Sequence, residues 1–470
     1  MKPCLRFMVS FPEVKGDCSC GKEHDRDQGK TVTLEPSRED KEDEDGYGDK
    51  ENDDIQFYGE AVELPPEQVF GFCIHRLYVT SGIKVLDVSL HIYRQMDPLS
   101  EAIKKSGADV YVMYASSRDA DMRYLTRFTT SDPFVYFKKP GERGTIIVSQ
   151  MEVLRASRES PAAVMTRAEA GLPEILKKEK DLTRATAKMI AGLAGKKILV
   201  PPQFPTGLAR ALEQFCAVSV DIGTVMSMRA KKTKAEIAAM RRVQKVTETA
   251  LGLGVALIKK SVAKRGVLHS RGVPLTAEQV KFAMHSHLLS CGCTAVDTIV
   301  SCGKDTAIPH MTGSGPLRAD EPIIIDLFPV EEKSGYYADM TRTVVKGEPT
   351  VEIREMYDTL RGAQQLGMSL VKPKVTGSDI YQAVVDFFAD HGYESDTRGF
   401  VHSLGHGVGL QVHELPNLGP GGKALAAGNV VTIEPGLYYP GTGGVRLEDM
   451  GAVTAHGFDN FTAFPEELVL

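Results

Sequence analysis

Short apolar runs alternate with helix-like segments in the middle of the chain, which predicts a domain built from both strands and helices. The runs Val110–Ala115, Phe134–Lys138 and Thr145–Val148 have the length and composition of strands. A helical pattern covers Ser100–Ser106, ahead of the first run. Because strands and helices alternate, we expect an α/β domain over residues 96–225.

A different order of elements begins after this region. Thr-Lys-Ala-Glu at Thr233 forms a capping box ahead of apolar residues at near-helical spacing, and a second box at Thr276 predicts another helix that ends near Gly292. The segments Asp297–Cys302 and Pro322–Val345 then have the composition of strands. The predicted order is two helices followed by strands.

The same order of elements recurs towards the end of the chain. A helix is expected from Thr350 towards Val371. A second helix, capped by Ser378, extends towards His391, and strands fill the remainder. This repetition predicts a domain over residues 226–470 made of two halves that face each other around a shared site.

Residues 1–95 differ from the rest in composition. Ser37–Asp54 holds ten acidic and three basic residues, so it accounts for the whole net charge of −6. A block of charge with almost no apolar residues predicts disorder. We therefore expect an acidic, partly disordered N-terminal extension, and Met96, where the patterned region opens, is a hypothetical natural start.

Composition argues against several classes of partner. Outside the acidic segment the chain is nearly neutral, whereas a nucleic-acid surface needs a clustered basic excess. No apolar run approaches the roughly 20 residues of a membrane span. The eight cysteines are scattered, which favours reduced thiols and a cytoplasmic location. Cys18 and Cys20 with His24 are an alternative zinc site, but no second pair completes it.

Two aspartates in the second domain are candidates for chemistry. Asp326 ends a continuous apolar run, and Asp339 lies on the returning segment after Gly335. An ionised carboxylate in such a buried strand is unfavourable unless its charge is compensated. A turn at Asp326 and an ion pair between Asp339 and Arg342 are the alternatives without a function.

Histidines concentrate in residues 402–416. Three glycines in this segment exclude a stable helix, because each costs about 1 kcal/mol there. His402 and His406 are expected to share one face of an extended segment, and His413 is expected to face the same cavity. Three of the chain's twelve histidines lie here, which favours a site over isolated surface residues.

Two glutamates complete the candidate site. Glu434 and Glu448 each lie in apolar strand sequence, and strand alternation places Thr432 beside the first and Arg446 beside the second. An ion pair between Glu448 and Arg446 is the alternative. Four carboxylates close together would repel one another, and two divalent cations would balance their charge. An oxygen-rich set with one nitrogen and no thiolate suits manganese, cobalt, iron or zinc.

These motifs resemble, in type and order, those of the M24 metallopeptidase superfamily of methionine aminopeptidases and Xaa-Pro peptidases. The resemblance runs from about Thr233 onwards and rests on IVSCGKDTAIPH, DMTRT, GHGVGLQVHELP, TIEPGLYY and GVRLED. It implies an α+β fold with a duplicated pita-bread catalytic domain. The preceding α/β domain resembles the creatinase and prolidase N-terminal domain, which implies the Xaa-Pro branch of aminopeptidase P and prolidase.

The resemblance also implies a metal-dependent activity. It assigns two divalent ions, most often manganese or cobalt, with zinc or iron as alternatives, to five ligands: Asp326, Asp339, His406, Glu434 and Glu448. Hydrolysis of Xaa-Pro bonds by a metal-bridging hydroxide is the expected reaction, with a peptide as substrate. A homodimer is the expected assembly, because dimers are usual in the family.

Two further histidines match positions that contact substrate in the family. Glu434 is the expected proton carrier, and His310 and His413 are expected to act on the reacting carbonyl or hold the substrate. His402 and Arg446 are additional candidates for substrate binding. A metal-free peptide-binding protein and a creatinase-like carbon–nitrogen hydrolase are the alternative functions.

The chain departs from the family pattern after Asp326. Leu327-Phe328-Pro329 follows it in place of the usual glycine, and Asp339 stands 13 positions further on, a wider spacing than is usual. A hairpin lengthened by an even number of residues keeps both aspartates on one face of the sheet. We therefore expect the departure to change the pocket rim near residues 328–334.

Overall fold

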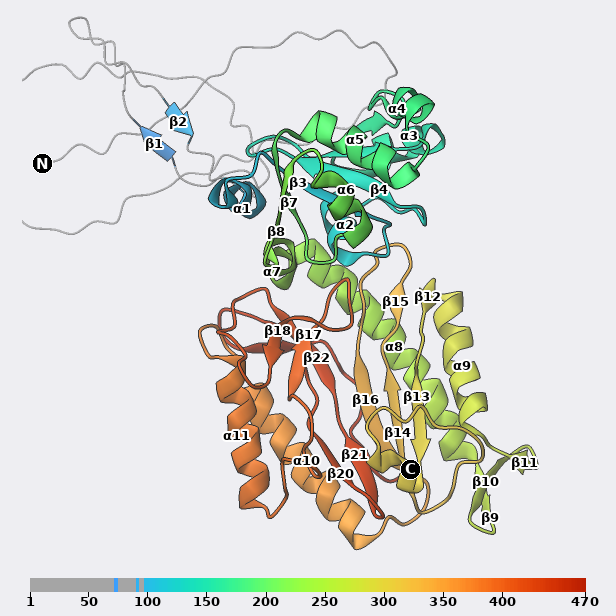
Figure 1. Ribbon diagram of the computed structural model, residues 1–470. Helices are drawn as coiled ribbons and strands as arrows, with labels where there is room; N and C mark the ends of the chain where they lie inside the picture. Colours follow the sequence, from blue (N-terminus) through green and yellow to red (C-terminus); the bar gives the residue numbers. More distant parts are fainter. Residues whose placement is uncertain (1–71, 75–89, 93–96) are drawn as a thin grey trace, which may run out of the picture. The chain divides into compact units, whose positions relative to one another are not determined.

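The computed structural model describes residues 72–74, 90–92 and 97–470 (Figure 1). The chain divides into two compact units, Met1–Gln95 and Met96–Leu470. In the first unit, β1 (Phe72–Ile74) and β2 (Leu90–Ile92) pair in antiparallel fashion. The disorder expected of the acidic segment, the alternative zinc site at Cys18, Cys20 and His24, and the hypothetical start at Met96 all lie outside the described residues.

The second unit begins with a mixed six-stranded sheet in the order β6-β5-β4-β3-β7-β8. Its strands are β3 (Val110–Ala115), β4 (Phe134–Lys138), β5 (Thr145–Val148), β6 (Ala163–Thr166), β7 (Lys197–Val200) and β8 (Ala217–Val220). The accompanying helices are α1 (Pro98–Ser106), α2 (Ala120–Thr126), α3 (Val153–Glu159), α4 (Leu172–Lys178), α5 (Leu182–Ala194), α6 (Thr206–Leu212) and α7 (Thr224–Ala230). Apolar clusters pack on this sheet, and the predicted α/β architecture is confirmed.

Two long helices open the next part of the unit. They are α8 (Lys234–Lys260) and α9 (Ala277–Ser290), and complete capping boxes at Thr233 and Thr276 begin them as predicted. Between them lies a small sheet of β9 (Val262–Lys264), β10 (Val267–Ser270) and β11 (Val273–Pro274). The predicted order of two helices followed directly by strands is therefore wrong here. These strands are short and mostly exposed, so they carry no apolar alternation that marks them in the sequence.

The strands that follow α9 form two small sheets. One consists of β13 (Ile299–Cys302), β14 (Pro322–Leu327) and β16 (Met340–Val345), all antiparallel. The other pairs β12 (Cys293–Thr294) with β15 (Val330–Glu331). Every residue of β14 and β16 is buried, although β16 carries the polar residues Thr341, Arg342 and Thr343.

The second half repeats this plan. Its helices are α10 (Val351–Leu370) and α11 (Gly377–Asp390), and its strands are β17 (Gly405–Gly407), β18 (Glu414–Leu418), β19 (Val430–Ile433), β20 (Gly436–Tyr439), β21 (Gly443–Arg446), β22 (Asp449–Val453) and β23 (Phe458–Asn460). Five of them form the sheet β18-β17-β19-β22-β23, and β20 pairs with β21.

One predicted helix start in this half is wrong. The cap of α11 is Thr376, whose hydroxyl accepts a hydrogen bond from the Asp379 amide at 3.0 Å, and not Ser378. A Cβ on Gly377 would collide with the carbonyl oxygen of Asn417 in β18. The glycine therefore lets the first turn of the helix pack closely on that strand, and the helix begins earlier than the serine suggests.

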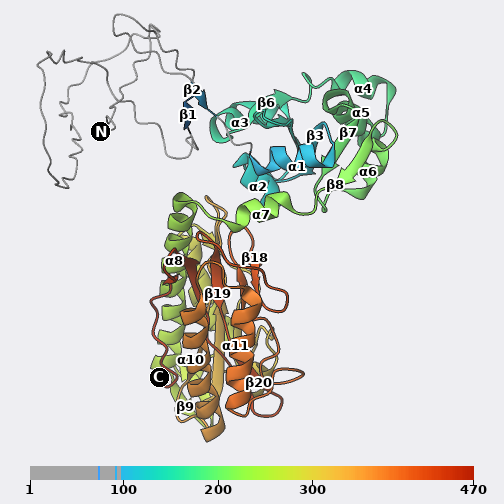
Figure 2. The same ribbon diagram turned by 90° about the vertical axis from the view of Figure 1, so that its left-hand side faces the viewer.

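The two halves enclose the strands between two helix pairs. Figure 1 shows α8 and α9 on one flank of the strands and α10 and α11 on the other, and Figure 2 gives the same arrangement turned by 90°. Each pair packs on its own apolar cluster. An antiparallel bridge between Thr341 and Glu448 joins the sheets of the two halves. This duplicated α+β architecture confirms the predicted fold class.

Among the described residues, none of the helices combines the length and the apolar surface needed to cross a membrane.

A buried guanidinium holds the chain's last strands against the first half. Arg342 of β16 forms an ion pair with Asp449 at 2.9 Å, and both side chains are almost fully buried. Arg342 also donates to four backbone carbonyl oxygens, those of Thr341, Glu448, Phe464 and Pro465. The alternative pairing of Arg342 with Asp339 is therefore wrong.

Replacing Arg342 with Met should lower the free energy of unfolding by about 3–5 kcal/mol, because Asp449 would stay buried without its partner. Arg354 is a matched control, since its pair with Glu348 is largely exposed. Arg354→Met should change stability by no more than about 1 kcal/mol. Urea unfolding followed by circular dichroism measures both, and equal losses would contradict a structural role for the buried pair.

Candidate metal centre

Two aspartates lie on neighbouring strands of the first half. Asp326 of β14 faces Thr341 of β16 across the sheet, and Asp339 directly precedes β16. Because side chains alternate along a strand, this register puts Asp326 and Asp339 on the same face. Phe328 and Tyr337 of the intervening hairpin line the cavity beside them.

A histidine from the second half faces these aspartates. His406 lies in β17, where the pairing with β18 shifts register between His406 and Gly407, an irregularity of the kind that redirects a side chain. Its Nδ1 lies 3.1 Å from the Gly407 carbonyl oxygen, which fixes the ring and turns Nε2 to the carboxylates. Nε2 lies 3.1 Å from Glu434 Oε1 and 3.8 Å from Asp339 Oδ2.

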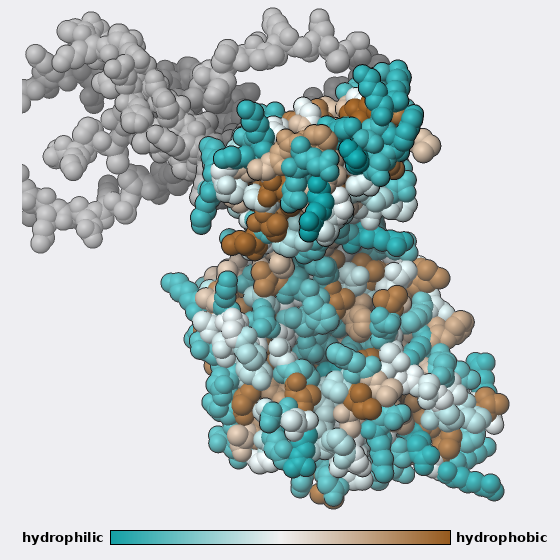
Figure 3. Space-filling view, viewed as in Figure 1, coloured by the Kyte–Doolittle hydropathy of each residue, from teal (hydrophilic) through white to brown (hydrophobic). Residues whose placement is uncertain are grey.

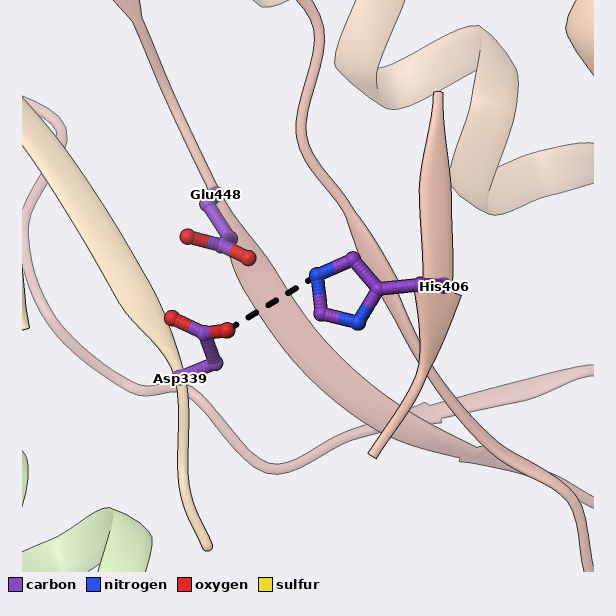
Figure 4. Close-up of side chains that lie close together, drawn as sticks. All are labelled: Asp339, His406 and Glu448. Carbon is purple, nitrogen blue, oxygen red and sulfur yellow. Dashed lines mark ion pairs between the residues drawn. The ribbon is translucent and has the colours of Figure 1, made fainter. Parts of the chain in front are cut away.

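Three of the candidate ligands converge closely. Figure 4 shows the side chains of Asp339, His406 and Glu448 pointing towards one another from three separate segments of the chain. One possible ligand atom from each lies within 4.8 Å of the other two. Glu434 joins them through His406, and Asp326 lies on the same face as Asp339. The structure thus gathers all five residues around one cavity.

Several carboxylate oxygens at this point are buried without a hydrogen-bond donor. They are Asp326 Oδ1, Asp339 Oδ1 and Glu448 Oε1. The other oxygens of two of these groups are satisfied, because Arg446 donates to Asp326 Oδ2 at 2.6 Å and Thr341 donates to Glu448 Oε2 at 2.9 Å. Buried acceptors are normally hydrogen-bonded, so three orphaned oxygens in one cluster fit a set of divalent metal ligands.

The electrostatics of the cluster support the same conclusion. Burial raises the pKa of Asp326, although Arg446 partly offsets this effect. Burial also raises the pKa of Asp339 and of Glu448 well above the usual range, and the charges of neighbouring carboxylates raise both further. Without a cation, these groups therefore favour the protonated form at higher pH than ordinary carboxyls do.

Glu434 and His406 form an ion pair within the cluster. Burial opposes the charge on each, but their hydrogen bond outweighs burial, lowers the pKa of Glu434 to about 2 and raises the pKa of His406 to about 9. A protonated Nε2 has no lone pair for a metal, so a metal ion bound there would displace this proton. The positive charge of the metal ion would then replace that of the His406 proton beside the Glu434 carboxylate.

Three more histidines line the same cavity, which measures about 1000 Å³. His402 is held by its contacts with the Ser403 carbonyl oxygen at 2.8 Å and with the Tyr438 hydroxyl at 3.0 Å. The ring of His413 lies 4.2 Å from that of His406, and His310 is exposed at the cavity. Figure 3 shows the surface hollowed over this part of the chain, with mostly hydrophilic residues in the hollow.

Arg446 has a partner different from the one considered in the sequence. It pairs with Asp326 of the other half and not with Glu448, and its Nη1 also contacts the Tyr438 hydroxyl at 2.8 Å. Tyr438 therefore holds both His402 and Arg446, a role that the sequence analysis missed. It lies in β20, and no local pattern distinguishes it from its neighbour Tyr439.

Comparison with known proteins decides the family. The profile described as "Metallopeptidase family M24" matches residues 238–455, and that described as "Creatinase/Prolidase N-terminal domain" matches residues 95–243. Residues 238–455 of the chain belong to metallopeptidase family M24. This membership confirms the resemblance inferred from the five motifs.

Individual relatives agree with the family. The M24 chain is 35% identical over 246 residues to an Xaa-Pro dipeptidase of Lactobacillus delbrueckii subsp. lactis, an alignment that covers 52% of this chain and 63% of the relative. The chain thus spans less than two thirds of the length of that curated relative. An Xaa-Pro dipeptidase from Bacillus anthracis has a similar structure, with 25% identity, a TM-score of 0.68 and coverage of 79% and 98% of the two chains. The prolidase from Pyrococcus horikoshii OT3 shares the fold at 24% identity, with a TM-score of 0.67 and the same coverage.

Asp339→Asn should change the stability of this M24 chain in opposite directions with and without metal. In metal-free protein at neutral pH the variant should be about 1–3 kcal/mol more stable, because it removes a carboxyl group that is buried among other carboxylates. With manganese added, the wild type should gain thermal stability and the variant should gain much less. The exposed Asp396 supplies the control Asp396→Asn. A variant that is destabilised equally in both conditions would contradict the proposed role of this carboxylate.

Proposed function

We propose that the chain is a metallopeptidase that hydrolyses Xaa-Pro peptide bonds with the help of two divalent metal ions. The observation that carries this proposal is the group of orphaned carboxylate oxygens beside His406 in a large cavity. Membership of family M24 and similarity to Xaa-Pro dipeptidases support it. A metal-free peptide-binding protein is disfavoured, because the carboxylate cluster would then stay uncompensated.

We propose that the metals are held by the predicted set: Asp326, Asp339, His406, Glu434 and Glu448. Asp339 and Glu448 would hold metal together with His406, and manganese or cobalt is the expected metal, with zinc or iron as alternatives. When bound, the ions would lower the pKa of a water molecule and polarise the scissile carbonyl.

Glu434 is proposed to move the proton in this reaction. Its Oε1 already accepts hydrogen bonds from His406 and from the Thr432 hydroxyl at 3.3 Å, so its orientation in the cavity is fixed. The nitrogen that leaves an Xaa-Pro bond carries no hydrogen and must be protonated as the bond breaks. A carboxylate that takes a proton from the attacking water and delivers it to this nitrogen meets that requirement.

The histidines around the cavity are proposed to bind the substrate. His310 and His413 have their rings at the cavity and would donate hydrogen bonds to the oxygen of the carbonyl under attack. His402 is held by Ser403 and Tyr438 in one orientation and would position the substrate beside them. The expected homodimer and cytoplasmic location stay predictions.

The direct test compares three peptides with protein loaded with manganese or cobalt. We expect cleavage of an Xaa-Pro dipeptide or an Xaa-Pro-Xaa tripeptide and not of a methionyl peptide without proline. Metal content must be measured on the same sample, because an ion pair separates this function from the metal-free and creatinase-like alternatives. Cleavage of none of the peptides with two ions bound would exclude the proposal.

Glu434→Gln should lower kcat by about 10²–10⁴-fold on the best of these peptides, since the variant loses the proton carrier. The exposed Glu467, which lies outside the cavity, supplies the control Glu467→Gln, with activity close to the wild type. Steady-state kinetics with measured metal content distinguish a loss of chemistry from a loss of metal. Wild-type turnover in Glu434→Gln would refute the assigned role.

A further inference from the structure

Beyond the proposed ligands, only three charged residues line the cavity in the described part of the chain. They are Asp297, Glu414 and Arg446. A dipeptide substrate ends in a carboxylate one residue after the scissile bond, and this charge has to enter the cavity. Whether these three residues are already paired within the protein therefore influences the length of peptide that the proposed site accepts.

Arg446 is fully engaged by the protein. Its Nη2 donates to Asp326 at 2.6 Å, its Nη1 contacts Tyr438 and the Pro309 carbonyl oxygen, and its Nε lies 3.3 Å from the Thr341 hydroxyl. Its side chain is only 4% exposed. Drawing Arg446 away to a substrate would break its buried hydrogen bonds to Asp326, Tyr438 and Pro309, which is unfavourable. The one arginine of the cavity is thus a structural partner of a proposed ligand.

Glu414 is also neutralised within the protein. Its two carboxylate oxygens accept hydrogen bonds from Arg229 and Lys232, each at 2.6 Å, and its side chain is 1% exposed. Arg229 in turn pairs with Asp121 at 2.5 Å. Arg229 and Lys232 are therefore already paired with buried carboxylates, and neither is available to bind a carboxylate of the substrate.

Asp297 differs from the other two, because it is exposed and has no cationic partner among the residues that the structure describes. It directly precedes Thr298 and β13, and its φ of 56° lies in the left-handed region, which Asp and Asn tolerate better than most residues. The unpaired charge that the cavity presents to a substrate is therefore negative. A second carboxylate placed nearby would meet repulsion and no counter-charge.

We propose that this site rejects the free carboxylate of an Xaa-Pro dipeptide and takes peptides that continue beyond the proline, so that the chain acts as an aminopeptidase. The inference rests on the proposed function and refines its substrate class. In a longer peptide a neutral amide replaces the carboxylate, and the cavity of about 1000 Å³ leaves room for further residues. Asp297 is the residue that sets this preference.

Three substrates with the same scissile bond test the inference: Ala-Pro, its C-terminal amide Ala-Pro-NH2, and Ala-Pro-Ala. With the manganese-loaded full-length protein, kcat/KM for the amide and the tripeptide should exceed that for the dipeptide at least about tenfold. The amide isolates the effect of charge, because it adds no residue. A dipeptide cleaved as fast as its amide would overturn the inference and leave the peptidase function standing, whereas cleavage of none of the three would overturn the function itself.

A charge series at Asp297 tests the assigned residue. The ratio of dipeptide to amide cleavage should rise from wild type to Asp297→Asn and again to Asp297→Lys, as the charge at this position changes from negative through neutral to positive. Asn also tolerates the left-handed backbone, so Asp297→Asn gives the result even if the lysine variant folds poorly. The exposed Asp305, which does not line the cavity, supplies the control Asp305→Asn. A ratio unchanged in Asp297→Asn, or raised equally in the control, would overturn the role of Asp297.

Discussion

The mutual repulsion of buried carboxylates is the constraint on which this structure depends. Asp326, Asp339 and Glu448 each keep a buried oxygen without a donor, and each lies in or directly beside a fully buried strand. No protein would gather such groups for stability alone, because each is costly without a counter-charge. The arrangement becomes favourable once divalent cations occupy it, so the fold and the proposed chemistry have the same physical origin.

The duplicated architecture supplies the cluster from both sides. The first half contributes two aspartates on one sheet face, and the second contributes His406 and two glutamates. The bridge between Thr341 and Glu448 and the pair of Arg446 with Asp326 cross from one half to the other. Each half therefore holds the candidate ligands of the other in position, and the candidate site exists only where the two meet.

Local signals in the sequence predicted much of this structure. The capping boxes at Thr233 and Thr276 marked helix starts because a cap depends on only four residues, and the buried strands were visible as apolar runs. The candidate ligands stood out because charged groups are rare in such runs. The small sheet between α8 and α9 gave no signal, since its strands are short and exposed. The partner of Arg446 lies 120 positions away, and only the folded chain reveals which carboxylate such a residue meets.

Anomalous X-ray diffraction from manganese-loaded crystals tests whether the cavity binds two metal ions. Two anomalous peaks are expected in the cavity, with the orphaned oxygens of Asp326, Asp339 and Glu448 and the Nε2 of His406 at coordinating distance. Once His406 has lost its Nε2 proton, Glu434 should also coordinate metal and complete the set. Peaks confined to surface carboxylates, or a cavity that contains only water at saturating manganese, would contradict the account.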